Sequence, residues 1–309
     1  MAARSRIESE TQMNSRAQIR MLPDGRRLHL QDGPIDLIVE AFGRSEDVRC
    51  AYQAACARFV TVLDELCSEL AFLRTACSAE SEWPRGSVAR RMTAVVMPYA
   101  GEFFITPMAA VAGAVAEEIL AAMLSAAELS RAYVNDGGDI AVHLAAGETF
   151  VIGMVERPDR PSLFGTTSIR SEDPVRGIAT SGWRGRSFSL GIADAVTVLA
   201  DRAAAADAAA TIIANAVDLP GHPAIVRVPA CELAPDSDLG ERLVTQNVGP
   251  LNAAEIDRAL MSGTATAEKL LRIGLIRSVA LNLQGQTRVV GGASKMISTS
   301  VEERNLVHA

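Results

Sequence analysis

Aromatic residues are scarce in this chain. Phenylalanine, tryptophan and tyrosine together make up 4% of its 309 residues. Surfaces that bind nucleic acid stack bases on aromatic rings and neutralise phosphates with clustered basic residues. The sequence offers neither feature, because its formal net charge is -7 and its lysines and arginines form no basic block. We therefore expect no nucleic acid among its partners.

Cysteine and histidine are also few, with five and four residues respectively. No two cysteines have C-x-x-C spacing, and the histidines lack the spacing of zinc ligands. An odd number of scattered cysteines is typical of reduced thiols in a cytosolic protein. The sequence therefore predicts a cytoplasmic protein without a structural zinc site.

Long uninterrupted apolar runs are missing. The most apolar stretch, residues 108–127, contains Glu117 and Glu118, so we expect a packed core helix there rather than a membrane span. Residues 1–18 are polar and lack the apolar segment of a secretory signal. No membrane association is expected. Dinucleotide-binding, P-loop, zinc-protease and hydrolase motifs are absent as well.

What the chain does contain is a clear alternation of helical and strand periodicities. The strongest helical pattern predicts a helix over 46–74, with Ser45 as its N-terminal cap. Further helices are predicted at 106–127 (Thr106 as cap, Pro107 first), 202–216 and 253–271. Strands are predicted at 35–39, 132–134, 140–142, 149–155, 163–169, 177–180, 195–200 and 224–228, with hairpins over 18–30 and 278–290.

Long helices interleaved with antiparallel hairpins indicate an α+β fold, in which mixed or antiparallel sheets pack with long helices. No break in composition requires two domains. We expect a single domain over residues 17–292, a disordered tail over 1–16 and a polar tail over 293–309. Residues 78–86 are predicted to form a surface loop.

The most informative stretch is the turn Asn135-Asp136-Gly137-Gly138-Asp139-Ile140. One interpretation is a simple hairpin loop, because asparagine, aspartate and glycine tolerate positive φ. The other is a ligand site, in which the backbone of Gly137 and Gly138 approaches a phosphate or a ribityl chain. Asn135 or Asp139 would then hold a hydroxyl or a ring edge.

A second candidate lies on the alanine-rich segment that follows. Asp207 and Thr211 are four residues apart, so both side chains lie on the same helix face. If the helix only packs against a sheet, Asp207 should lie on the solvent face. An isolated carboxylate among alanines otherwise needs a partner, and a cation shared with Thr211 would supply one.

The third candidate is the loop Thr180-Ser181-Gly182-Trp183-Arg184-Gly185-Arg186. It is either a polar loop that ends a strand or part of a binding site. In a site, Arg184 or Arg186 would hold an anion, and Trp183 would cover a flat ring.

Together these pieces resemble the ApbE flavin transferases, which move FMN from FAD onto a protein threonine with magnesium. The turn at 135–140 resembles their "N-x-G-G-D-I", and Thr180-Ser181-Gly182 resembles their "T-S-G". Ala195-Val196-Thr197-Val198, followed by Asp207 and Thr211, is similar to "S-V-T-V … A-D-A-x-x-T". Residues 110–116 resemble the "G-x-A-K-G-Y-A" helix start. The four pieces keep the family order, and the chain is most similar to an ApbE-like branch found in bacteria and archaea.

The resemblance implies an ApbE-like (T-fold-like) fold, with FAD or FMN and Mg2+ as cofactors. It assigns the metal to Asp207, Thr211 and the Ala112 carbonyl. It assigns the flavin pocket to the remaining motif residues, which are Asn135, Gly137, Gly138, Asp139, Thr180, Ser181 and Gly182. It implies no catalytic residue, because the "H-I-x-D-P-x-T-G" segment of the family has no counterpart among residues 183–194. Gly113 also replaces the family lysine.

Three hypotheses follow. The first is an enzyme that binds FAD through Mg2+ and transfers FMN to a protein threonine. The second is a non-catalytic flavin- or nucleotide-binding accessory protein of a cytoplasmic redox pathway, with a redox protein as partner; the missing histidine segment favours it. The third is a scaffold without a ligand, which predicts a fully solvated Asp207.

Overall fold

A nine-stranded antiparallel sheet forms the centre of the molecule. The computed structural model describes residues 16–78, 80, 83–155, 163–292 and 306–308. The strand order is β1-β2-β3-β4-β5-β8-β9-β12-β13, and every neighbouring pair is antiparallel. The strands are β1 (Gln18–Met21), β2 (Leu28–Asp32), β3 (Ile35–Phe42), β4 (Arg131–Asp136), β5 (Asp139–Leu144), β8 (Gly177–Ser181), β9 (Ala195–Ala200), β12 (Ser278–Leu283) and β13 (Gln286–Gly291).

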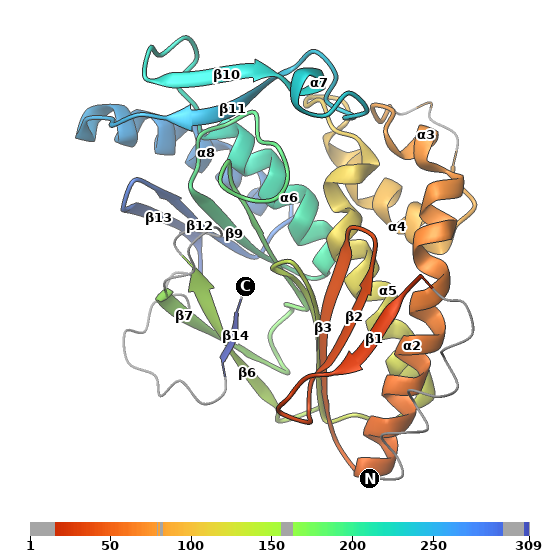
Figure 1. Ribbon diagram of the computed structural model, residues 1–309. Helices are drawn as coiled ribbons and strands as arrows, with labels where there is room; N and C mark the ends of the chain where they lie inside the picture. The colour runs from red at the N-terminus through yellow and green to blue at the C-terminus, as the bar shows by residue number, and fades with distance from the viewer. Residues whose placement is uncertain (1–15, 79, 81–82, 156–162, 293–305, 309) are drawn as a thin grey trace.

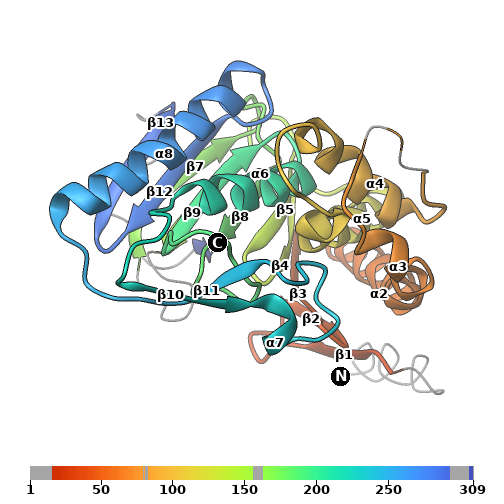
Figure 2. The same cartoon turned by 90° about the horizontal axis from the view of Figure 1, so that it is seen from above.

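Helices cover one face of this sheet (Figures 1 and 2). They are α2 (Ser45–Ser68), α3 (Leu70–Leu73), α4 (Ser87–Val96), α5 (Val111–Ala126), α6 (Ala203–Ala216) and α8 (Ala253–Arg272), with short 3-10 turns at Met97–Tyr99 and Pro107–Ala110. The main hydrophobic core lies between the sheet and these helices. The predicted α+β fold, with antiparallel sheets packed against long helices, is therefore confirmed.

A smaller sheet packs on the other face. It consists of β6 (Thr149–Val155), β7 (Leu163–Arg170) and β14 (Leu306–His308), in the order β14-β6-β7. Phe150, Ile152 and Ile169 of this sheet pack with Ile140 and Ile178 of the central sheet in a second hydrophobic cluster. Strands β10 (Ile225–Pro229) and β11 (Leu243–Val248) form a separate two-stranded sheet next to the short helix α7 (Ala230–Leu233).

The apolar segment of the chain is a core helix, as predicted. By length and composition, Pro107–Ala126 is the one described helix that could cross a membrane. In the structure it packs on β4 and β5 of the sheet and contacts α2, α4 and α6 (Figure 2), and Gly113, Val115, Ile119 and Met123 are buried.

Of the two predicted helix caps, Ser45 is wrong, whereas Thr106 takes the N-cap position as predicted but makes no side-chain capping bond. Helix α2 starts one residue early, so Arg44 takes the N-cap position and Ser45 is already helical. The Arg44 side chain instead forms an ion pair with Asp47 at 2.6 Å, which fixes this first turn. Thr106 does precede Pro107, but its hydroxyl makes no cap and donates to the Asp238 carboxylate at 2.5 Å.

Helix α4 and strand β11 had no predicted counterpart. The predicted single domain over 17–292 remains a prediction. Of the predicted tails, residues 1–15, 293–305 and 309 lie outside the described part of the chain.

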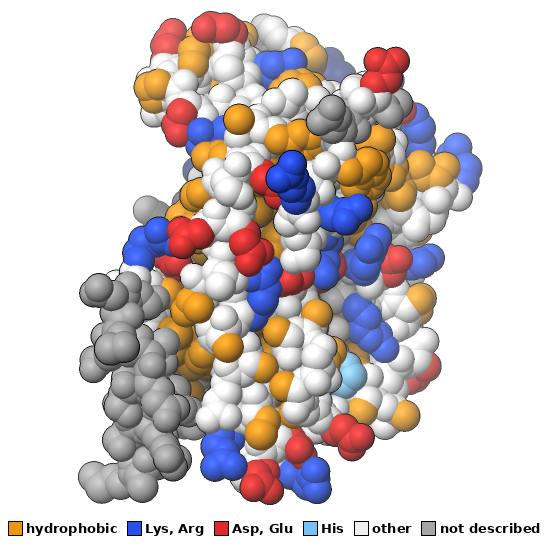
Figure 3. All heavy atoms as spheres, turned by 90° about the vertical axis from the view of Figure 1, so that its right-hand side faces the viewer, with side chains coloured by type: hydrophobic (Ala, Val, Ile, Leu, Met, Phe, Trp, Pro, Cys, Tyr) orange, Lys and Arg blue, Asp and Glu red, His pale blue; other side chains and the backbone are white. Residues whose placement is uncertain are grey.

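The face shown in Figure 3 mixes acidic and basic side chains, without a large area of one charge sign.

Candidate flavin nucleotide site

Two hairpin turns and the loop after β8 meet at one end of the central sheet. Arg186 of the loop connects them. Its Nη2 donates to the Pro34 carbonyl in the turn between β2 and β3, at 2.9 Å. A Cβ atom on Gly137, in the turn between β4 and β5, would lie 2.9 Å from its Nη1. The structure thus brings the predicted glycine turn and the predicted polar loop together.

The glycine turn is a two-residue hairpin. Asp136 and Asp139 are paired in the register of β4 and β5. Gly137 and Gly138 have φ values of 63° and 112°, which non-glycine residues rarely adopt. The Asn135 side-chain oxygen accepts a hydrogen bond from the Gly138 amide at 2.8 Å. Turn formation therefore accounts for these residues locally, and a ligand contact from Asn135, Gly137 or Gly138 stays a prediction.

Asp207 lies close enough to Asp139 for its charge to influence the ionisation of Asp139. Asp139 begins β5 on the face that packs against the helices, because the adjacent Ile140 belongs to the cluster on the opposite face. Desolvation raises the pKa of Asp139 well above its ordinary value, and the negative charge of Asp207 raises it further. Desolvation also raises the pKa of Asp207 to about 7. The turn and the helix that the sequence singled out are thus neighbours in the fold.

Asp207 is not fully solvated. It is half-buried, and its Oδ2 accepts a hydrogen bond from the Gly113 amide at 3.0 Å. The Ala112 amide also donates to this carboxylate and lowers its pKa. A solvent-facing Asp207, which the scaffold hypothesis and the packing-only interpretation both require, is not observed.

The remaining two predicted metal ligands lie near Asp207. Thr211 follows it by one helical turn and is half-buried. The backbone of Ala112 is in the first turn of α5, and its amide is directed at Asp207. The metal-binding role of the Ala112 carbonyl and of the Thr211 hydroxyl stays a prediction.

Small residues allow α5 and α6 to approach closely. A Cβ atom on Gly113 would lie 2.4 Å from the Ala203 carbonyl oxygen, which is closer than real Cβ contacts. Ala114 and Ala116 on α5 and Ala206 on α6 are fully buried. This packing explains why the chain departs from the family pattern at Gly113, because a lysine side chain has no room at this position.

The two helices also cap each other. The N-cap residue of α6, Arg202, makes no side-chain cap. Instead, Glu117 of α5 accepts a hydrogen bond from the Ala204 amide at 2.8 Å. Asp207 of α6 in turn accepts from the start of α5. Each carboxylate lies at the positive end of the neighbouring helix, where negative charge is favoured.

The T-S-G loop is fixed to the site at its first residue. The Thr180 amide donates to the Asp139 carboxylate at 3.3 Å, while the Thr180 hydroxyl is 2.9 Å from the Thr197 hydroxyl. Ser181 ends β8 and is half-buried. Gly182 is required by close packing, since a Cβ atom there would lie 2.4 Å from the Asp194 carbonyl oxygen.

Two carboxylates near the site were not proposed as functional from the sequence. Asp136 is buried, with a side chain that accepts a hydrogen bond from the Asp36 amide. Desolvation raises its pKa to about 7, against the opposing effect of this bond and of the Arg186 charge. Asp194 is also buried. Asp136 stands inside the glycine turn and Asp194 directly precedes Ala195-Val196-Thr197-Val198, but the burial of both depends on partners far away in the sequence.

The carboxylate arrangement fits a magnesium ion only if the ligand supplies further oxygens. Among the described residues, no group of three or more histidine, cysteine, aspartate or glutamate side chains is arranged to hold a metal. Magnesium is commonly bound by one or two carboxylates together with substrate phosphates and water. Asp139 and Asp207 are two desolvated carboxylates whose mutual repulsion a cation would relieve.

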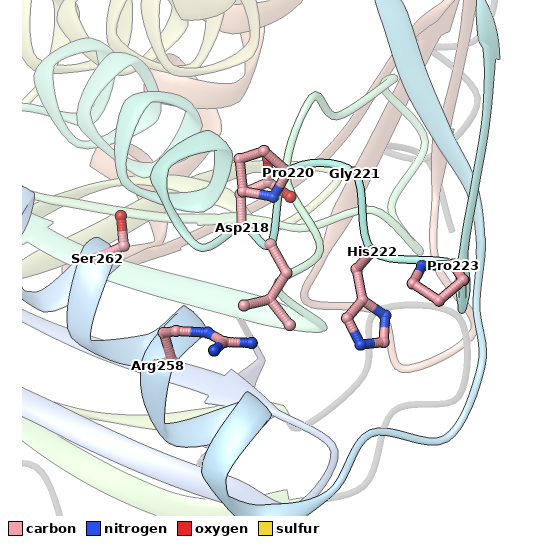
Figure 4. Close-up of a pocket in the computed structure, with 8 residues that line it drawn as sticks. Asp218, Pro220, Gly221, His222, Pro223, Arg258 and Ser262 are labelled. Atoms are coloured by element: carbon pink, nitrogen blue, oxygen red, sulfur yellow. The ribbon is translucent and has the colours of Figure 1, made fainter.

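A cavity of about 490 Å³ lies elsewhere, beyond the C-terminal end of α6 (Figure 4). It is lined by Asp218, Leu219, Pro220, Gly221, His222, Pro223, Arg258 and Ser262. Its charges are largely satisfied within the protein, because Asp218 pairs with Arg227 and His222 lies 3.2 Å from Glu255. None of the predicted site residues lines this cavity.

The fold and site define an α+β protein of the ApbE-like class. A family model described as AbpE bacteria matches residues 19–289. The chain therefore belongs to this family, and the resemblance inferred from the four sequence pieces is confirmed.

Curated relatives match part of the chain. A UPF0280 protein from Methanopyrus kandleri is 43% identical over 128 residues, which cover 41% of this chain and 48% of that protein. A UPF0280 protein from Methanococcoides burtonii is 40% identical over 119 residues, which cover 38% of this chain and 48% of that protein. The chain thus spans about half the length of the curated relatives it matches.

Solved structures with a similar course of the chain are named as flavin transferases. One is the flavinyl transferase ApbE of Pseudomonas stutzeri in its apo form, with 11% identity, a TM-score of 0.48, and coverage of 93% of this chain and 98% of that one. Another is a variant of the flavin transferase ApbE from Vibrio cholerae, with 13% identity, a TM-score of 0.46, and coverage of 90% and 98%. The family assignment rests on the family model rather than on these scores.

Proposed function

We propose that this protein binds FAD or a related flavin nucleotide through Mg2+ at the end of the sheet where Asp139 faces Asp207. The observation that carries the proposal is the closeness of these two desolvated carboxylates, since the negative charge of Asp207 raises the pKa of Asp139. A divalent cation removes this repulsion and attracts the pyrophosphate of a nucleotide. The family motifs supply the flavin as the ligand class.

The residues of the chain divide into two groups in this proposal. Asp207 and Thr211, with the Ala112 carbonyl, hold the cation from the helix side. From the sheet side, Asp139 and the glycine turn face the ligand, with Asn135, Thr180, Ser181 and Gly182 around the flavin pocket. When bound, the cation neutralises the pyrophosphate oxygens.

Asp139 is oriented by the fold before any ligand arrives. The Thr180 amide donates to it, and its place at the start of β5 is fixed by pairing with Asp136. A carboxylate that is already held in place loses little conformational entropy when the ligand and its cation bind. The proposal therefore needs no rearrangement of the sheet.

A specific observation separates binding from catalysis. Residues 183–194, which follow the T-S-G piece, contain no histidine, whereas the resembled family carries one in this segment. We therefore propose binding as the function and treat FMN transfer to a protein threonine as the second candidate. The non-catalytic candidate is an accessory protein that supplies flavin to a cytoplasmic redox partner.

One experiment tests both candidates. The purified chain is incubated with FAD and Mg2+, with and without a threonine-containing acceptor peptide, and then denatured. Flavin that stays with the native protein through dialysis and is released on denaturation supports binding. Covalent flavin fluorescence on the peptide, with release of AMP, identifies a transferase. Absence of any retained flavin, with or without Mg2+, contradicts the proposal.

A further inference from the structure

Asp194 is a buried carboxylate that joins three separate segments. Its side chain is 7% exposed. Oδ1 accepts hydrogen bonds from Trp183 Nε1 at 3.2 Å and from Arg184 Nε at 3.0 Å. Oδ2 accepts from the Gln284 amide, in the turn between β12 and β13, at 2.6 Å. The start of β9, the T-S-G loop and this turn are therefore held together by one side chain.

These contacts fix the Arg184 guanidinium from two directions. Asp194 holds it at Nε, and its Cζ lies 4.0 Å above the centre of the Trp183 ring. A guanidinium carries five N–H donors, and only the Nε–H is used here. Within the described part of the chain, its Nη1 and Nη2 atoms make no hydrogen bond or ion pair. The side chain is 27% exposed, so the free donors are accessible.

Trp183, on which the Arg184 guanidinium stacks, lies on the same face of the sheet as the candidate cation site. Trp183 packs against the core between the sheet and the helices, the face on which Asp139 and Asp207 meet. It is three residues from Thr180, whose amide donates to Asp139. A hydrogen bond from the Trp183 amide to the Ala193 carbonyl, at 3.0 Å, also holds the loop against the segment before β9.

We propose that Arg184 binds a phosphate group of the nucleotide and that Asp194 and Trp183 are the positioning residues that orient its guanidinium. This inference rests on the proposed function and adds the residue that recognises the ligand's anion. A planar guanidinium matches two phosphate oxygens at once. Fixing it in advance removes the entropy of ordering a long side chain when the ligand binds.

Asp194 does not cancel the charge of Arg184 completely. Its carboxylate shares two further donors, the Trp183 indole and the Gln284 amide. Four guanidinium N–H groups remain for an anion. A phosphate bound there would lie on the same face of the sheet as a cation at Asp207, so in this proposal the guanidinium and the cation both neutralise charge on the pyrophosphate of the nucleotide.

The test uses tryptophan fluorescence in the full-length chain. The chain has two tryptophans, and Trp83→Phe leaves Trp183 as the single reporter. Trp83 is 55% exposed and has no part in the proposed site. Titration with inorganic pyrophosphate, FAD and riboflavin, all with Mg2+, separates recognition of phosphate from recognition of the flavin ring, because riboflavin carries no phosphate.

In this background, Arg184→Ala is expected to weaken pyrophosphate and FAD binding about 10- to 100-fold, the loss typical of charge-assisted hydrogen bonds. Riboflavin binding should change less than about threefold. Arg184→Lys keeps the positive charge but not the planar guanidinium that contacts two phosphate oxygens, so its affinity for pyrophosphate and FAD should lie between those of the wild type and the alanine variant. Asp194→Asn should lower the preference for FAD over riboflavin without abolishing it. Arg258→Ala removes an exposed arginine from the cavity in Figure 4 and serves as the matched control.

The outcomes separate the inference from the proposed function. If FAD and riboflavin bind but Arg184→Ala weakens both equally, the phosphate role is wrong and the flavin site remains. If pyrophosphate binds in an Arg184-dependent manner and no flavin binds, the flavin proposal fails and the anion site stands. Binding of neither probe contradicts both. Because Arg184→Ala leaves Asp194 without its ion pair, thermal unfolding is measured for every variant, and Arg184→Lys decides the result if the alanine variant is unfolded.

Discussion

Asp207 and Gly113 lie at the contact between the two central helices, where the Asp207 carboxylate accepts a hydrogen bond from the Gly113 amide at 3.0 Å. The carboxylate proposed to bind a cation is thus also a cap for the neighbouring helix α5. One oxygen is directed at the helix start, which leaves the other lone pairs of the group for a cation. Structural and functional roles therefore fall on the same side chain.

The packing at Gly113 predicts a large cost for a very small substitution. Gly113→Ala places a methyl group 2.4 Å from the Ala203 carbonyl oxygen, so α5 and α6 must separate. We expect the free energy of unfolding to fall by about 1–3 kcal/mol, measured by urea denaturation. Gly101→Ala is the matched control, because a methyl group there meets nothing within 4 Å. An equal effect of both substitutions would contradict the close packing.

Glu117 should stabilise α6 although it belongs to α5. Its carboxylate accepts from the Ala204 amide at 2.8 Å and pairs with Arg91 at 3.0 Å. Glu117→Ala leaves the start of α6 uncapped and should cost about 1–2 kcal/mol of unfolding free energy. Glu268→Ala, at an exposed helical position, should change it by less than about 0.5 kcal/mol. If Glu117→Ala is as mild as the control, the cap contributes nothing.

The raised carboxyl pKa values predict a stability that depends on pH. Desolvation brings the pKa values of Asp136 and Asp207 to about 7, from 3.8 in an unperturbed side chain. Between these values the folded chain binds more protons than the unfolded chain, so this contribution is fully present below about pH 4 and is lost as the pH rises through about 7. In the presence of a chelator, the free energy of unfolding should therefore decrease over this interval.

The matched variant for this pH dependence is the double substitution Asp136→Asn/Asp207→Asn, which keeps the side-chain size and removes both titrating groups. Its unfolding free energy should decrease less between about pH 5 and pH 8 than that of the wild type. Mg2+ should protect the wild type most at the upper end of this interval, where the carboxylates are ionised. An identical slope for the two proteins would show that these groups do not titrate as the structure implies.

Most of the fold could be predicted from periodicity, because long amphipathic patterns depend on local sequence. The helix predicted over 46–74 is found as α2 and α3, at 45–68 and 70–73, and the hairpin predicted over 278–290 is found at 278–291. Helix α4 has a buried face at helical spacing, with Val88, Met92 and Val95 buried, but its ten residues are too few for a strong periodic signal. Among the described residues, strand β11 pairs with β10 alone, and its burial pattern lacks the strict alternation of a half-buried strand.

The site was predictable only as a set of separate pieces. The resemblance implied that the glycine turn and the Asp207 helix belong to one site, and in the structure Asp207 is close enough to Asp139 to raise its pKa. The hydrogen bond between Asp207 and Gly113 joins residues 94 positions apart, which no local pattern encodes. The role of Asp194 depends on Arg184 and on the Gln284 amide, 90 positions away. Such tertiary contacts become visible only when the chain is folded.

The most direct test of the cation site is calorimetric titration of FAD into the wild type and Asp207→Asn, with and without Mg2+, at about pH 8. The asparagine side chain keeps an oxygen for the Gly113 amide, so the fold is retained while the charge is lost. We expect Mg2+ to tighten FAD binding by the wild type at least about tenfold, and to have no such effect on Asp207→Asn. The same dependence on Mg2+ in both proteins would contradict the account.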